Sequence, residues 1–361
     1  MCRFATMTVL LMVMALSHSK AHAEVKVVEA DSTYIMGDND SKVDARRIAM
    51  QEVKRKALEI AGTYVAGMTE VKNYQLTKDE IKTYTAGVME TEVESEQMRG
   101  TTEHPEIYIK ARCTIDTGVL MKLIDRYQDN EDLKEQIESS ARENEALRKE
   151  RDALVQQLAA EKDKAKVEET RKKLDTALAK EETNDETTKV WTNLAYKFHE
   201  NDESGHEVGQ ADLDKSARVL ERAVRVNPQN ARARFLLAVI YQKRGDYAAA
   251  ENELRTAIQS NPSNPIPHLR LGILKRERGR YEEALQEFHF VERMRPNNPM
   301  MLFYTGMTMK DVGKCGRAVK YLQRFVKHKR VSNFPRKKEQ AMKAIEACGE
   351  EGGRQRRTRF R

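Results

Sequence analysis

The sequence predicts a mainly α-helical protein in three parts: a small α+β N-terminal domain, a long helix of coiled-coil type, and an α-solenoid of short helical repeats. Three observations lead to this fold class. Motifs recur every 34 residues in the C-terminal half, residues 127–182 contain neither Pro nor Gly, and alternating apolar residues near the N-terminus are typical of strands. Charged residues make up 34% of the 361 positions and aromatic residues only 6%, which favours extended helical architecture over a compact enzyme core.

The first 23 residues have the pattern of an export signal. Arg3 precedes an apolar stretch at 7–16, and a small-residue cleavage motif, Ala-His-Ala, follows at 21–23. A membrane-spanning helix needs roughly 20 apolar residues, about twice the length of this stretch. We therefore expect cleavage after Ala23 and a periplasmic mature protein.

Residues 24–125 predict the small α+β domain. Apolar residues alternate in VKVVEADSTYIM, in EIYIKARCTIDT and, less regularly, in GVMETEVESEQM, as strands require. DSKVDARRIAMQEVKRKALEIAGTYV and LTKDEIKTYTAG have helical spacing. The segment resembles the N-terminal domain of flagellar assembly protein T and of LPP20-type envelope proteins in the Gly37–Asp40 turn and in Ala45, Arg46, Ala49, Ala57 and Ala61. This resemblance implies an accessory role in the envelope or flagellum without catalysis, although the chain lacks the lipid-anchoring Cys of LPP20-type proteins.

Residues 126–185 predict a coiled-coil spacer. The apolar residues at the a and d positions of a heptad are Leu133, Ile137, Leu147, Leu154 and Leu158. Asn144 occupies a further a position. Ser140, Arg151 and Glu161 interrupt this seam. Two interpretations stay open: a parallel homodimer through residues 130–180, or a single helix held by charge pairs one turn apart. In both, the spacer is on the order of 80 Å long.

The C-terminal half repeats itself at a spacing of 34 residues. Gly, Ala and Pro recur in register at 245/279/313, at 250/284/318 and at 228/262/296. This pattern resembles the tetratricopeptide repeat and covers three clear units, 231–264, 265–298 and 299–332. A degenerate unit around Trp191 and Leu194, with an insertion near 201–210, begins the array at 186, and a capping helix closes it at 333–350.

The last repeat and the capping helix contain a cysteine pair. Cys315 lies where the second helix of the last repeat begins, and Cys348 lies where the capping helix ends. Antiparallel neighbouring helices place these two points at the same end of the array, so we expect a disulfide; the alternative is two unpaired thiols.

The resemblance implies a binding surface for a protein partner. In tetratricopeptide arrays the first helix of each unit lines the concave face, and the matching partner-binding positions here are Lys189, Tyr196, Arg232, Phe235, Gln242, Arg276, Met300, Phe303, Met307 and Lys310. Apolar residues interspersed with cations suit an extended peptide with hydrophobic anchors and acidic flanks. Phe235 and Val239 stand where the family's carboxylate clamp has Lys and Asn, and the alternative is that all these residues only pack between repeats.

Other polar clusters do not form a recognisable chemical motif. GDNDS at 37–41 lacks the later Gly and Glu of a calcium loop, His199 and His206 are too far apart for a helical zinc pair, and Cys113 has no neighbouring His. We therefore expect no enzyme, no metal and no cofactor.

The C-terminal end is strongly basic. From residue 301 onward, 17 Lys and Arg stand against 5 Asp and Glu, whereas the rest of the chain has 47 against 52. In an exported protein the tail at 351–361 favours contact with an anionic surface or an acidic partner over nucleic acid; the alternative is a solubilising end. Taken together, these features predict an exported adaptor or scaffold that binds a protein partner through the repeat groove. The alternative is a permanent structural component of the cell envelope or flagellar base.

Overall fold

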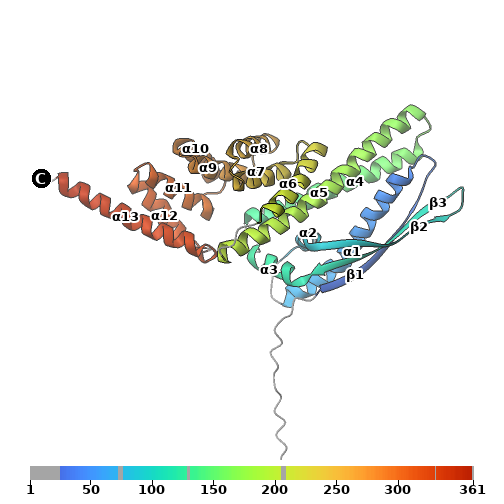
Figure 1. The fold of residues 1–361 in the computed structure, drawn as a ribbon, viewed down its shortest axis with the longest axis horizontal. Coiled ribbons are helices and arrows are strands. Elements are labelled where there is room, and N and C mark those ends of the chain that lie inside the picture. The colour runs from blue at the N-terminus through green and yellow to red at the C-terminus, as the bar shows by residue number, and fades with distance from the viewer. Residues whose placement is uncertain (1–24, 72–75, 128–130, 205–208, 330, 360–361) are drawn as a thin grey trace, which may run out of the picture.

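The structure is a computed structural model that describes residues 25–71, 76–127, 131–204, 209–329 and 331–359. The expected export signal at 1–23 lies outside these residues. The three-stranded sheet occupies one end of the molecule, the last helix occupies the other, and the repeat helices lie between them (Figure 1).

The N-terminal unit is an antiparallel sheet covered by one long helix. Strands β1 (Val25–Ile35), β2 (Met89–Gly100) and β3 (Pro105–Asp116) take the order β1-β3-β2, and β1 pairs with β3 from Val25 opposite Asp116 to Ile35 opposite Glu106. Helix α1 (Lys42–Val71) contacts β1 and β3, and α2 (Lys78–Val88) and α3 (Thr117–Tyr127) complete the unit. The expected strands and helices are therefore present.

The alternation in β3 explains why α1 lies on this face. Every second side chain of the strand is fully or almost fully buried, namely Ile107, Ile109, Ala111, Cys113 and Ile115. The α1 residues that pack in the same core include small ones, which let the helix lie close to the sheet: Ala45, Ala49, Ala57 and Ala61. The four alanines that contribute to the envelope-domain resemblance thus have a packing role here.

The single spacer helix expected at 126–185 is instead a helical hairpin. Helix α4 (Glu131–Ala160) ends, and α5 (Lys164–Ser204) runs back beside it (Figure 1). Asp163 starts the second helix, because its carboxylate accepts hydrogen bonds from the backbone N–H groups of Ala165 and Lys166. Asn39 donates to the carbonyls of Leu158 and Glu161, so the turn at 37–41 holds the tip of the hairpin.

Ser140 and Arg151, two of the residues that interrupt the heptad seam, join the two helices. Ser140 is buried and its hydroxyl lies 3.3 Å from that of Thr188, and the amide of Asn184 donates to that of Asn144. Leucines 158, 174 and 178 are fully buried beside Ile48 of α1. These seam residues are covered within one chain. The parallel homodimer through residues 130–180, one of the two interpretations of the sequence, stays a prediction. The side chains of Leu133 and Ile137 lie outside the described residues.

The repeat region consists of helical hairpins packed in chain order. Helix α5 pairs with α6 (Gln210–Val226), α7 (Ala231–Lys243) with α8 (Tyr247–Ser260), α9 (Pro265–Glu277) with α10 (Tyr281–Met294), and α11 (Pro299–Asp311) with α12 (Cys315–Val326). Helix α5 therefore crosses the boundary expected at 185/186 and belongs to both the hairpin and the first repeat.

The 34-residue motifs match specific turns and contacts. Asn230, Asn264 and Asn298 cap the first helices α7, α9 and α11 through their side-chain oxygens. Glycines 245, 279 and 313 have φ values of 82°, 72° and 73°, a left-handed conformation that favours Gly between the two helices of a unit.

The last helix is longer than expected. After a short 3-10 turn, Val331–Asn333, helix α13 runs from Pro335 to Arg359, through most of the segment expected as a basic tail. Its Ala341 and Ala344 pack in the same core as Phe325 of α12. A disulfide joins Cys315 to Cys348 with a Cα–Cα distance of 5.2 Å, and Cys113 is a buried free thiol.

The N-terminal unit packs directly on the first repeat. Gly87 of α2 faces Thr192 of α5 so closely that an added Cβ would lie 2.0 Å from the Thr192 hydroxyl oxygen. Thr192 is only 2% exposed. The absence of a side chain at Gly87 therefore permits this contact between the two parts.

We predict that Gly87→Ala destabilises the protein by about 1–3 kcal/mol, because the new methyl group must displace Thr192 or move α2. Urea unfolding followed by circular dichroism measures the change. Gly67→Ala is the matched control: an added Cβ there meets nothing within 4 Å, and removing a helical Gly is neutral or slightly stabilising. Equal effects of the two substitutions would contradict the close contact.

We predict that the oxidised protein yields one cross-linked peptide pair containing Cys315 and Cys348. Reduction then lowers the free energy of unfolding by about 2–4 kcal/mol, because the unfolded chain regains the freedom of the closed loop. Peptide mass spectrometry without reductant tests the bond. Alkylation of both cysteines under those conditions would show that the two thiols are free.

Candidate functional site

The residues expected to form a partner-binding surface lie on the first helices α5, α7, α9 and α11, but they do not form one open face. The structure divides them into four groups: residues covered by the N-terminal unit, residues facing α4, residues bridging successive repeats, and residues at the last repeat. The side chain of Tyr196 lies outside the described residues, as do those of His199 and His206.

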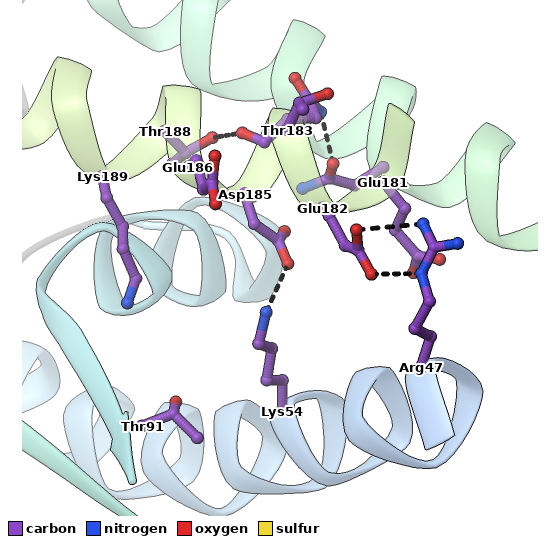
Figure 2. A network of polar contacts seen from close by, with 12 residues as sticks. Arg47, Lys54, Thr91, Glu181, Glu182, Thr183, Asp185, Glu186, Thr188 and Lys189 are labelled. Carbon is purple, nitrogen blue, oxygen red and sulfur yellow. Dashed lines mark hydrogen bonds and ion pairs between the residues drawn. The ribbon is translucent and has the colours of Figure 1, made fainter. Parts of the chain in front are cut away.

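Lys189 faces the N-terminal unit instead of a repeat groove. Its ammonium nitrogen lies 3.6 Å from a carboxylate oxygen of Glu90 on β2. Figure 2 shows the side chain extending from α5 toward the strand that bears Thr91. Lys189 thus lies where the N-terminal unit packs on the beginning of the array, and its partner-binding role stays a prediction.

Gln242 and Arg276 bridge successive repeats. The Gln242 amide donates to Glu277, and the Arg276 guanidinium donates to Asp311 at 2.6 Å. Each acceptor lies 35 residues after its donor, on the first helix of the next unit. These two side chains fix the relative positions of neighbouring repeats, so they are less available to a partner than expected.

Phe303 belongs to the core. It is 4% exposed, and its ring centroid lies 5.2 Å from that of Phe325 and 5.1 Å from that of Tyr304. The prediction of a partner-binding role fails here, because the second helix of the last repeat supplies an aromatic side chain that covers this position. Met300, Met307 and Lys310, on the same helix, are half-buried and keep part of their surface open.

Arg232 and Phe235 face α4 across a cavity of about 330 Å³. Ile266 and Pro267 of α9 line the same cavity on the repeat side. Desolvation lowers the pKa of Arg232 to about 10, and the charge of Glu143 on α4 opposes this decrease. Burial raises the pKa of Glu143 in turn. No pattern in the sequence indicates this arrangement, because α4 lies outside the repeats.

A second polar cluster joins the N-terminal unit to the hairpin. Lys54 and Arg47 on α1 point toward Asp185 and Glu182 on α5, with nitrogen–oxygen distances of 3.5 and 2.8 Å (Figure 2). Burial raises the pKa of Asp185. A cavity of about 360 Å³ lies between α1, α2, α4 and α5 at this junction.

Arg151 of α4 is the most buried cation of this cluster. It is 2% exposed and contacts Glu181 on α5 and Glu52 on α1, both at 3.1 Å. Burial raises the pKa of Glu181 to about 7, against the opposing charge of Arg151. Because the buried charges are paired with one another, the cluster acts as a structural junction.

Neither a cluster of metal ligands nor a membrane-spanning helix is found among the described residues. Among those residues, no three or more His, Cys, Asp or Glu side chains gather closely enough to coordinate a metal. None of the helices described there combines the length and apolar character that crossing a membrane requires.

Comparison with known proteins identifies the repeats. Two tetratricopeptide repeat models match residues 206–265 and 243–301, so this region of the chain carries tetratricopeptide repeats. Repeats of this family are generally protein-interaction scaffolds, and neither match indicates an enzyme family. No curated protein matches the sequence.

Similar solved structures include MamA AMB-1, with 19% identity over 40% of this chain and 76% of that one and a TM-score of 0.32. The structure of "YrrB: a TPR protein with an unusual peptide-binding site" has 14% identity over 46% and 77% and a TM-score of 0.33. A Thermobaculum terrenum O-GlcNAc transferase has 24% identity over 34% and 22% and a TM-score of 0.28.

We predict that Glu181 makes the protein more stable at about pH 5 than at about pH 8. Its pKa in the folded chain lies near 7, above the 4.5 of an ordinary Glu, so folding takes up a proton between these values and stability falls as pH rises through them. Thermal unfolding across this range measures the slope, and Glu181→Gln should flatten it. Glu182→Gln, which breaks the neighbouring contact with Arg47, is the control. An unchanged slope in Glu181→Gln would contradict the assignment.

Proposed function

We propose that this protein is a scaffold that binds an extended segment of a protein partner along the first helices of its repeats. The observation that carries the proposal is the set of partly open apolar and cationic side chains on these helices, within and beyond the matched repeat region: Arg232, Phe235, Met300, Met307 and Lys310. Apolar side chains provide contact area, while arginine and lysine favour acidic flanks in the partner.

We also propose that the protein acts in the periplasm. The signal pattern at 1–23 and the Cys315–Cys348 disulfide support this, because disulfides persist in oxidising compartments. The resemblance of residues 24–125 to envelope and flagellar accessory domains supports a role in the envelope. There the N-terminal unit would position the repeats near their partner. The basic C-terminal residues would add contact with an anionic surface.

We predict that Arg232→Gln, Met300→Gln and Lys310→Gln together weaken partner capture by about tenfold or more, because contact area and charge are lost on one surface. The measurement is affinity capture from a periplasmic extract with the mature protein as bait. The matched control carries the same changes on second helices, at Arg218 of α6, Met294 of α10 and Lys320 of α12, which are exposed.

Loss of the same partner from both folded variants, or from neither, would refute the proposed surface. Partners that stay bound in high salt and co-purify at fixed stoichiometry would favour the alternative, a permanent structural component of the envelope or flagellar base, over a reversible adaptor.

A further inference from the structure

The cavity between α4 and the repeats is a slot with two unlike walls. The repeat wall combines the apolar side chains Phe235, Ile266 and Pro267 with polar ones that include Gln229, Asn261 and Asn264. The α4 wall presents the polar side chains Ser139, Arg142 and Glu143. At about 330 Å³ the slot is within the lower range of pockets that hold small ligands, and it is large enough for a few side chains of an extended peptide.

The charges of the slot favour an anionic group. Arg232 lies on the repeat wall and Glu143 is the only carboxylate residue among the described residues that line the slot. Arg142, on the α4 wall, is 69% exposed and pairs with Glu138 at 3.5 Å, so a ligand there shares it with that carboxylate. Arg232 and Glu143 are both strongly desolvated, as the shifts of their pKa values indicate. A guanidinium in such a place binds a carboxylate more strongly than one in open solvent does.

We propose that α4 is the second wall of the partner-binding site: an extended peptide segment lies between α4 and the first helices α7 and α9. It places an apolar side chain against Phe235 and Ile266, and an Asp or Glu side chain next to Arg232 and Arg142. This inference rests on the proposed function and specifies its partner. Because α4 is not part of any repeat, the selectivity of the site comes from the hairpin as well as from the array.

The position of α4 makes the wall a rigid one. Ser139 and Glu143 lie next to Ser140 and Asn144, which contact Thr188 and Asn184 on α5. Helix α5 is itself the first helix of the array, so the slot has a fixed width. A peptide therefore enters a preformed site, which reduces the entropy lost on binding.

The test blocks the slot from the α4 side. A random peptide library displayed on phage is selected against the full-length mature protein, and selected peptides are synthesised for titration. Ser139 is an exposed residue on the slot wall. The substitution Ser139→Trp should weaken the binding of these peptides by about tenfold or more, because the indole occupies the space that they need. Ser139→Ala keeps the space and should bind normally. Lys149→Trp is the matched control, since its side chain is 74% exposed and does not line the slot.

Each outcome either supports the proposed slot or overturns it. Peptides that combine an apolar residue with a neighbouring Asp or Glu, and that lose affinity in Ser139→Trp alone, support the slot. Some peptides could bind the Ser139→Trp variant as well as the unaltered protein but lose affinity for the double variant Met300→Gln/Lys310→Gln. That result would overturn the proposed slot and leave the proposed function standing. Failure to select any peptide that binds the folded protein overturns both.

Discussion

Arg151 fixes the arrangement of the molecule, because its guanidinium reaches carboxylates on two other helices. From α4 it contacts Glu181 on α5 and Glu52 on α1 while only 2% exposed. A buried cation of this kind is costly unless every partner is in place, so it penalises other relative positions of the three helices. It thereby favours the antiparallel hairpin and the contact of the hairpin with the N-terminal unit, together with the Ser140–Thr188 contact and the leucine core beside Ile48.

The repeats could be predicted from sequence because their determinants are local. A left-handed Gly, an asparagine cap and a proline after the second helices α6, α8 and α10 recur at fixed spacing and need no knowledge of distant residues. The hairpin could not be predicted in this way. In the sequence, Ser140 and Arg151 only interrupt a heptad seam, because the partners that explain them lie 30 to 99 residues away on other helices. Polar residues in a helical seam are ambiguous until the partner helix is known.

The candidate site, too, can be predicted from sequence only where its determinants are local. Family positions located Arg232 and Phe235, but they could not show that α4 faces them or that α2 covers the beginning of the array. The bridging role of Arg276 had a detectable signal, since an acidic residue follows 35 positions later, as it also does for Gln242. Burial of Phe303 depends on aromatic neighbours in the second helix and was not visible from its repeat position alone.

Helix α5 has a mechanical consequence. It is one unbroken helix of 41 residues, about 60 Å at 1.5 Å per residue, and it contacts the N-terminal unit, α4 and the repeats. No hinge separates the sheet from the array along this helix. It therefore acts as a rigid strut that keeps the repeats at a set distance and angle from the sheet.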